Sequence, residues 1–270
     1  MKLFDLVKQR RSVRSFDGRP LTTEDREKIE AFIKTIDDPF DKKIDWTFLS
    51  QSENRLSVPV ITGCDTYIAG KMKKESDCEL AFGYQFEQIV LYCTSIGVGT
   101  TWIAGTMDRK GFEETIGLKE DEVMPCISPL GYEAEKMSFR ETMMRKGIKA
   151  DTRLPFESLF FDEDFTVPLK KEKDEELTKL LELVRLSPSA VNKQPWRIVI
   201  KDGKVHFYEK SDKGYSDPDG YDIQKIDMGI ALCHFVMGLK EMGKQGRIFL
   251  EEPDIEVPLN TFYIASVDYE

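Results

Sequence analysis

The sequence predicts an α+β protein made of two tandem, degenerate repeats that pack against each other as a pseudo-dimer. Two observations carry this prediction. Helix-like and strand-like patterns alternate along the 270 residues, and the second half follows the order of the first. In addition, glycines bracket one long apolar helical segment in each half, and the equivalent glycines lie 146 positions apart: Gly83 with Gly229, and Gly97 with Gly243.

The repeats divide the chain into two units of similar length, as a chain of 270 residues allows. We expect a first half at residues 1–150 and a second half at residues 151–270, each built around one core helix, at 80–97 and 226–243. The predicted strands correspond as well: residues 46–49 match 196–199, and the strand ending at Tyr132 matches 261–269.

Local signals place the remaining elements of the first half. Leu3, Leu6 and Val7 share one face of a short first helix, and Thr22 or Thr23 caps a second one. Further on we expect, in order, segments of strand composition at 58–61 and 67–70, an extended piece at 101–105, a helix at 111–118 and a strand at 123–130. The polar residues 133–153 lack an apolar period and predict a linker or wrapping arm.

One connection in the second half is richer in functional groups than a turn requires. An amphipathic helix is expected at residues 175–186 and a strand at 198–200, so residues 187–196 join a helix to a strand. This connection reads Ser-Pro-Ser-Ala-Val-Asn-Lys-Gln-Pro-Trp, and its two prolines stiffen a backbone that carries several hydrogen-bonding side chains. The residues alone leave two interpretations open, an ordinary proline-rich loop and a ligand-binding loop.

A cluster of cations follows the first predicted helix. Lys8, Arg10, Arg11 and Arg14 surround Ser12 in a chain whose net charge is −10. Cations at a helix C-terminus complement the helix dipole, which accounts for one or two of them. Guanidinium groups also pair with phosphate oxygens through charge-assisted hydrogen bonds, and a serine hydroxyl adds a donor. A phosphate cradle is therefore favoured over simple helix capping.

Composition argues against several classes of protein. A net charge of −10 does not suit binding to a nucleic-acid backbone, which needs clustered Lys and Arg. No apolar run is long enough to span a bilayer and the N-terminus lacks signal-peptide features, so we expect a cytoplasmic protein without a membrane partner. The five cysteines form no C-x-x-C pair and suit reduced, buried thiols. The two histidines, His206 and His234, lie in apolar or strand-like settings, which favours structural roles and no metal site.

The repeats differ where chemistry is expected. The arginine cluster occurs only in the first half, because its echo at 158–163 carries no cations. The proline-rich loop occurs only in the second half, because its counterpart at 38–43 has a different composition. A symmetric dimer would carry two equal sites, so this chain is expected to keep one.

Two motifs together resemble those of the FMN-dependent nitroreductase family. They are residues 10–16, Arg-Arg-Ser-Val-Arg-Ser-Phe, and residues 188–196, Pro-Ser-Ala-Val-Asn-Lys-Gln-Pro-Trp. The duplicated layout resembles the internally fused, single-chain branch of that family, and the resemblance covers nearly the whole chain. It implies an α+β fold of mixed, mainly antiparallel sheets wrapped by helices. It also implies FMN held between the halves of a monomer that acts as a fused pseudo-dimer.

The resemblance further implies which residues hold FMN. On the phosphate and ribityl side these are Arg10, Arg11, Ser12, Arg14 and Arg153, beside the ring they are Ile103, Ala104 and Gly105, and from the second half they are Pro188, Ser189, Ala190, Asn192 and Gln194. The family often has an acidic residue where Ala104 stands, and a Lys-x-Arg where this chain has residues 151–153, Asp-Thr-Arg. These departures alter the electrostatics near flavin N5 and weaken the implied phosphate grip.

The implied activity is that of an FMN-dependent NAD(P)H oxidoreductase without a catalytic side chain. Hydride would pass from NAD(P)H through flavin N5 to a small organic acceptor, of nitroaromatic or quinone type, in a ping-pong mechanism. Two alternatives remain, an FMN-binding or sensory protein without turnover and a scaffold with an empty site. Bound flavin that NAD(P)H does not reduce would indicate the first alternative, and no bound flavin the second.

Overall fold

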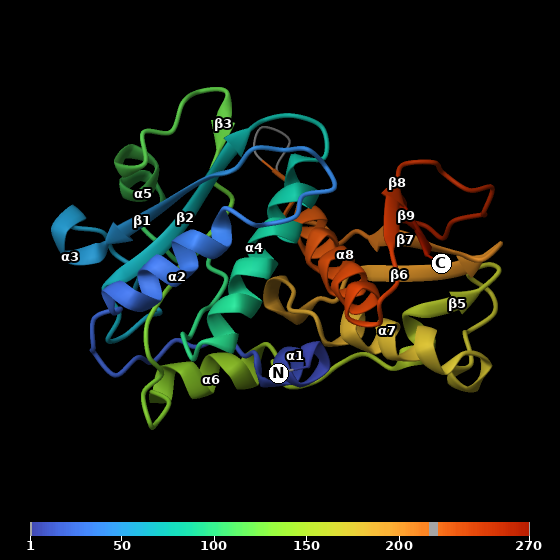
Figure 1. Cartoon of the computed structure of the whole chain (residues 1–270), viewed down its shortest axis with the longest axis horizontal. Coiled ribbons are helices and arrows are strands. Elements are labelled where there is room, and N and C mark those ends of the chain that lie inside the picture. Colours follow the sequence, from blue (N-terminus) through green and yellow to red (C-terminus); the bar gives the residue numbers. More distant parts are fainter. Residues whose placement is uncertain (1, 216–220, 270) are drawn as a thin grey trace.

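The protein consists of two β-sheets with a pair of long helices between them (Figure 1). The structure is a computed structural model that describes residues 2–215 and 221–269. One sheet comes from residues 45–129 and the other from residues 160–269. We call residues 1–150 the N-terminal half and residues 151–270 the C-terminal half.

Both sheets are mainly antiparallel, as expected, and the second one is mixed. The first contains β1 (Asp45–Ser50), β2 (Thr66–Lys73), β3 (Glu122–Val123) and β4 (Ile127–Pro129). Its central strand β2 pairs antiparallel with each of the other three. The second contains β5 (Phe160–Asp162), β6 (Trp196–Lys201), β7 (Lys204–Lys210), β8 (Gly246–Phe249) and β9 (Thr261–Tyr269), in the order β5-β6-β7-β9-β8. Only the β5–β6 pair is parallel.

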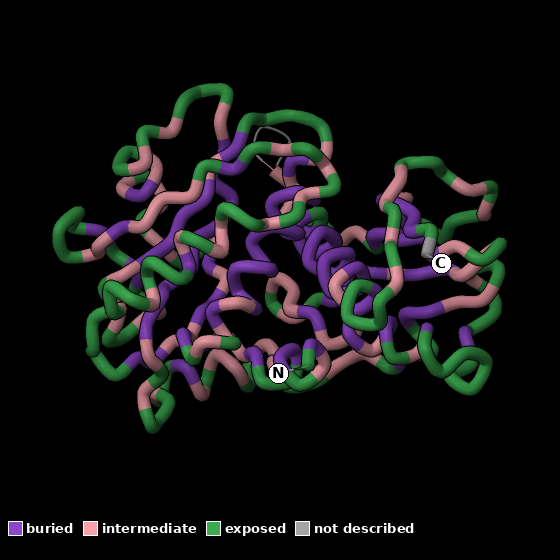
Figure 2. Tube along the Cα trace, in the orientation of Figure 1, coloured by how far each residue is buried: buried purple, intermediate pink, exposed green. Residues whose placement is uncertain are grey.

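Helices cover the sheets and fill the space between them (Figure 1). The α-helices are α1 (Leu3–Gln9), α2 (Thr23–Ile33), α3 (Gln51–Asn54), α4 (Cys78–Ser95), α5 (Arg109–Thr115), α6 (Phe139–Gly147), α7 (Glu175–Leu186) and α8 (Ile223–Glu241). Short 3₁₀ turns occur at Phe156–Ser158, Lys171–Lys173 and Ala190–Asn192. The two expected core helices are confirmed as α4 and α8, and both are buried along most of their length (Figure 2). No helix in the described ranges is long and apolar enough to cross a membrane.

Helices α4 and α8 cross at two glycines, a contact that we call the glycine crossing. A Cβ added to Gly83 would lie 2.1 Å from the carbonyl oxygen of Ile226, and one added to Gly229 would lie 2.2 Å from that of Leu80. The contact is reciprocal, since Leu80 and Ile226 are also 146 positions apart. The two backbones touch because neither glycine has a side chain to separate them.

Next to the glycine crossing, each of the two helices contributes side chains to the hydrophobic core of the opposite half. Leu80 and Tyr84 of α4 pack within the core of the C-terminal half. Ile226 and Ile230 of α8 pack within the core of the N-terminal half. These pairs are again 146 positions apart, and each half therefore depends on the other for part of its buried apolar surface.

Residues 133–153, which we expected to form a linker or wrapping arm without regular structure, contain the helix α6. Ser138 precedes this helix, and its Oγ accepts a hydrogen bond from the N–H of Glu141 at 3.1 Å. A serine followed three residues later by glutamate is the sequence signature of a capping box. That local signal identifies the helix start even though the helix has almost no apolar face.

Two strand predictions also need correction. The strand expected at 123–130 is interrupted between β3 and β4, where Pro125 lacks the N–H that a continuous ladder requires. Residues 58–61 form a turn, in which the Ile61 N–H donates to the Val58 carbonyl at 3.0 Å. The proline in that segment starts a turn rather than an edge strand.

Substituting Gly83→Ala should lower the free energy of unfolding by about 1–3 kcal/mol or more, because the added methyl group meets backbone rather than a movable side chain. Gly147→Ala is the matched control, since Gly147 is also helical and a Cβ there meets nothing within 4 Å. It should leave stability unchanged or raise it slightly. Urea unfolding of both variants checks this, and equal effects would contradict a close crossing.

Candidate functional site

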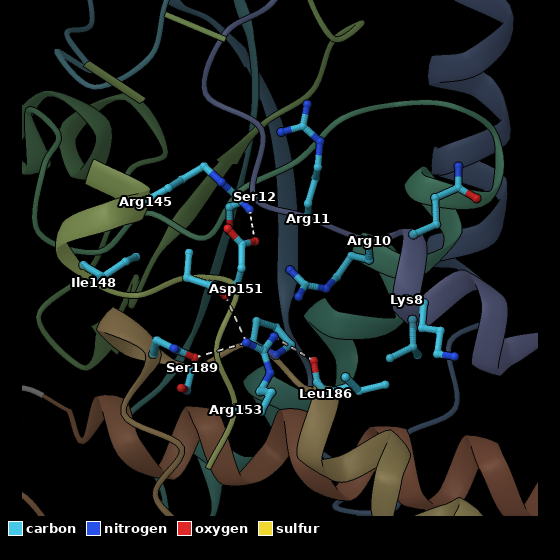
Figure 3. A pocket seen from close by; sticks show the side chains of 15 residues that line it. Lys8, Arg10, Arg11, Ser12, Arg145, Ile148, Asp151, Arg153, Leu186 and Ser189 are labelled. Carbon is cyan, nitrogen blue, oxygen red and sulfur yellow. Dashed lines mark hydrogen bonds and ion pairs between the residues drawn. The ribbon is translucent and has the colours of Figure 1, made fainter. Parts of the chain in front are cut away.

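A cleft of about 320 Å³ lies where three segments of the chain meet. It is lined by parts of residues 7–12 at the end of α1 and beyond, residues 145–153 at the end of α6 and beyond, and residues 186–192 at the end of α7 and beyond. In Figure 3 the side chains of Arg10, Arg145 and Arg153 extend into it from different segments. We call it the arginine cleft.

The structure brings seven of the thirteen predicted FMN-binding residues together at this cleft. Those that line the arginine cleft are Arg10, Arg11, Ser12, Arg153, Pro188, Ser189 and Asn192. Arg14, Ala190 and Gln194 lie nearby in sequence but are not among the lining residues. Ala104 and Gly105 line a separate cavity, and Ile103 is buried in the core of the N-terminal half.

The arginine side chains present buried nitrogen atoms without hydrogen-bond acceptors. Within the described residues, Nε of Arg10, Nη1 of Arg11, Nη1 of Arg14 and Nε of Arg153 are buried and lack such a partner. A buried donor without an acceptor costs about 1–3 kcal/mol, and more when it is charged. Several such donors around one cleft fit an anion with several oxygens, as a phosphate has.

Burial and mutual repulsion disfavour the charged form of the arginines at this cleft. Burial, followed by the positive charges of Arg10 and Arg185, lowers the pKa of Arg153 to about 10. Burial also lowers the pKa of Arg10, which the negative charge of Glu87 partly opposes. These guanidinium groups therefore lack the water that stabilises their charge in solution. A bound anion would stabilise that charge instead.

Two acidic residues near the cleft offset part of this charge. Glu141 is 2 % exposed, and its Oε1 lies 3.8 Å from Nη1 of Arg11, which also pairs with Glu133. Asp151 pairs with Arg145. Sequence reasoning did not select Arg145 or Glu141, because it treated the whole segment as a linker.

The loop from residue 187 to residue 194 has an unusual backbone. Val191, Asn192 and Gln194 all have positive φ, at 42°, 61° and 53°. A β-branched residue in the left-handed region is strained, typically by about 1–3 kcal/mol. The surroundings must therefore hold this conformation in place.

Buried hydrogen bonds hold the loop. The Ala190 N–H donates to both carboxylate oxygens of Asp227 on α8, each at 3.0 Å. Burial raises the pKa of Asp227 well above its ordinary value. The Gln194 N–H donates to Oγ of Ser189 at 2.9 Å, which closes the loop on itself.

The two amide side chains of the loop bind the segment that follows α6. Nδ2 of Asn192 donates to the carbonyls of Lys149 and Thr152, at 2.7 and 3.1 Å. Oε1 of Gln194 accepts the Leu154 N–H at 2.8 Å. Both residues thus fix the loop against the connection between the halves and place Pro188 and Ser189 at the arginine cleft.

A second cavity, of about 570 Å³, contains the segment expected beside the flavin ring. Ala104 and Gly105 line it together with Arg109, Tyr215 and Tyr221. Tyr215 and Tyr221 come from the C-terminal half, so this cavity also lies between the halves.

Neither histidine lines the arginine cleft or the second cavity. Nδ1 of His206 lies 2.6 Å from Oγ of Ser266. His234 is fully buried and bridges the Leu183 carbonyl and the Glu87 carboxylate, each at 2.9 Å. No group of three or more His, Cys, Asp or Glu side chains within residues 2–215 and 221–269 is arranged to hold a metal ion.

The fold and its arginine cleft define an α+β protein with a cationic site between two halves. A family model described as "Putative TM nitroreductase" matches residues 2–239. The chain therefore belongs to this nitroreductase family and shares its oxidoreductase class.

One solved structure agrees with this fold along nearly the whole chain. It is described as a "putative nitroreductase" from Thermotoga maritima MSB8 and is 25% identical, with a TM-score of 0.65 over 99% of this chain and 93% of that one. Nitroreductase family proteins from Clostridium novyi NT and Clostridium difficile 630 are 16% and 17% identical, each with a TM-score of 0.45. They match 50% and 57% of this chain, and 87% and 94% of their own. No curated protein sequence matches significantly.

Substituting Val191→Gly should raise the free energy of unfolding by about 1 kcal/mol, because glycine adopts a positive φ without strain and the Val191 side chain is half exposed. Val167→Gly is the matched control, since Val167 is equally exposed but has an ordinary φ. It should lower stability by about 0.5–1 kcal/mol. Chemical denaturation of both variants gives the sign, and destabilisation by both would contradict strain in the loop.

Proposed function

We propose that this chain is an FMN-dependent NAD(P)H oxidoreductase that binds one FMN between its two halves. The observation that carries the proposal is the set of buried guanidinium nitrogens without hydrogen-bond acceptors around the arginine cleft. Three of these arginines, Arg10, Arg11 and Arg153, line the cleft, whereas Arg14 belongs to the same motif as Arg10 and Arg11 but does not line it. Membership of the nitroreductase family supports a flavin as the ligand.

The residues present fit this cofactor. Arg10, Arg11 and Arg153 would hold the phosphate, and Ser12 would add a hydroxyl donor. Pro188 and Ser189 would approach from the C-terminal half. The chemistry that FMN supplies when bound is reversible two-electron transfer, from NAD(P)H as hydride donor to a small organic acceptor.

The protein would contribute to the activity by binding FMN, orienting it and setting the charge around it. The strained loop keeps Pro188 and Ser189 fixed, so that the ligand meets a preformed wall. Donor and acceptor would occupy the same pocket in turn, which predicts ping-pong kinetics. Nitroaromatics and quinones are the acceptor classes to test first.

We also propose that the chain is a fused pseudo-dimer, divided near residue 150, that acts as a monomer. The reciprocal contacts of Gly83 with Ile226 and of Gly229 with Leu80 support it, since reciprocity is the mark of a twofold interface. The exchange of equivalent apolar side chains between the two cores supports it too. Only one of the two sites that such symmetry would generate retains the arginine motif and the proline-rich loop.

A flavin-binding protein without turnover is the second candidate, and Ala104 is the observation that favours it. This position carries no charge beside the expected ring site, where related proteins often have an acidic residue. Anaerobic mixing of the flavin-loaded protein with NADH or NADPH separates the candidates. Bleaching of the flavin absorbance is expected for the enzyme and none for the binder.

Substituting Arg10→Ala or Arg153→Ala should weaken FMN affinity by about 10- to 100-fold, which corresponds to one or two lost charge-assisted hydrogen bonds. Affinity for riboflavin, which lacks the phosphate, should change little. The control Arg26→Ala removes an exposed arginine on α2 and should change neither affinity. Flavin fluorescence titration measures all of these.

The comparison of the two ligands makes this test specific to the phosphate. Equal losses of FMN and riboflavin affinity would indicate damage to the fold. Unchanged FMN affinity in both variants would contradict the phosphate assignment of the arginine cleft.

A further inference from the structure

A histidine and a glutamate form a buried pair where α8 packs against α4. Nε2 of His234 lies 2.9 Å from Oε1 of Glu87, and Nδ1 of the same ring lies 2.9 Å from the Leu183 carbonyl oxygen. The other carboxylate oxygen of Glu87 accepts a hydrogen bond from Nε1 of Trp102 at 3.2 Å. Both members of the pair are fully buried. Their hydrogen bonds are therefore shielded from water.

The hydrogen-bond partners indicate how many protons this pair holds. A carbonyl oxygen can only accept, so Nδ1 of His234 donates to Leu183. An ionised carboxylate also only accepts, so a second proton lies either on Nε2 of His234 or on the carboxyl group of Glu87. In both cases the pair as a whole carries no net charge. Without this proton, the lone pair of Nε2 would face a buried carboxylate, which is costly.

The equivalent position in the N-terminal half keeps the backbone contact but not the ionisable pair. Gln88 lies 146 positions before His234, and its Nε2 donates to the Asp37 carbonyl at 2.9 Å. Asp37 in turn lies 146 positions before Leu183. The position equivalent to that of the glutamate is occupied by Cys233. A glutamine therefore suffices for the structural contact, and the ionisable pair requires a different explanation.

The pair lies next to α1, whose C-terminal end leads into the arginine cleft. Leu91, one turn after Glu87 on α4, and Leu183 on α7 both pack against apolar side chains of α1. Arg10 directly follows α1, lines the cleft and is 9 % exposed. Burial lowers the pKa of Arg10, and the negative charge of Glu87 opposes this shift. The carboxylate and a bound anion would therefore interact with the same positive charge and repel each other.

We propose that His234 sets the anion affinity of the arginine cleft, because it neutralises Glu87 and leaves the charge of Arg10 to the bound phosphate. This inference rests on the proposed function for the identity of the anion. With the shared proton in place, the pair adds no net negative charge beside the cleft. A phosphate group then binds more tightly than it would near an unbalanced carboxylate. His234 does not line the cleft and acts only through Glu87.

The test measures dissociation constants of the full-length protein for FMN, inorganic phosphate and riboflavin. His234→Gln is the informative variant, because Gln88 already makes the equivalent backbone contact and glutamine cannot carry the balancing proton. It should weaken FMN and phosphate binding about three- to tenfold and leave riboflavin binding unchanged. The double variant Glu87→Gln/His234→Gln should restore both affinities, since it also removes the negative charge.

The matched control is Gln88→Leu, which removes the equivalent backbone contact without a change of charge and should alter none of the three affinities. Unchanged phosphate affinity in His234→Gln would overturn the inference. A loss that the double variant does not reverse would overturn it too, since His234 would then act only by stabilising the fold.

Glu87→Gln alone tests the inference even if His234→Gln does not fold. It should leave phosphate affinity within about twofold of the wild type, because a neutral side chain replaces a carboxylate that is already neutralised. Markedly tighter phosphate binding would show an unbalanced charge on Glu87 in the wild type and would contradict the inference. A wild-type protein that binds phosphate but not FMN overturns only the proposed function, which distinguishes the two failures.

Discussion

At Gly83 and Gly229 the helices α4 and α8 meet backbone to backbone, and the rest of the architecture depends on this contact. Each helix carries side chains into the core of the opposite half, so neither half buries its apolar surface alone. Segments distant in sequence, at the ends of α1, α6 and α7 and just beyond them, meet at one cleft.

The cleft concentrates positive charge in a protein of net charge −10. Glu141 and Asp151 offset part of it, yet buried nitrogens of Arg10, Arg11 and Arg153, which line the cleft, have no hydrogen-bond acceptor in the described structure. Such an arrangement is unfavourable without an anion, and natural folds keep it where a ligand compensates. The strained loop around Val191 belongs to the same pattern, because strain in a well-braced loop is typical of binding sites.

The elements with a strong hydrophobic period were predictable from the sequence, and so was the equivalence of the glycines in the two halves. The core helices were predictable because both are apolar almost all round, and the equivalence of Gly83 and Gly229 was visible as a fixed offset. Helix α6 was missed because its stability comes from capping at Ser138 and from charge pairs, which leave no apolar period. The hydrogen bonds from Arg109 to three backbone carbonyls and to the Tyr221 hydroxyl were not predictable, because these acceptors come from segments that only the tertiary fold brings together.

The central claim is that one composite site is built from both halves of a single chain. The most direct measurement is the number of FMN molecules per chain after reconstitution and gel filtration, with the mass of the flavin-bearing particle determined by light scattering. The account predicts one FMN per chain on a particle of one chain, about 31.1 kDa. Two FMN per chain, flavin only on a dimer, or no retained flavin would contradict it.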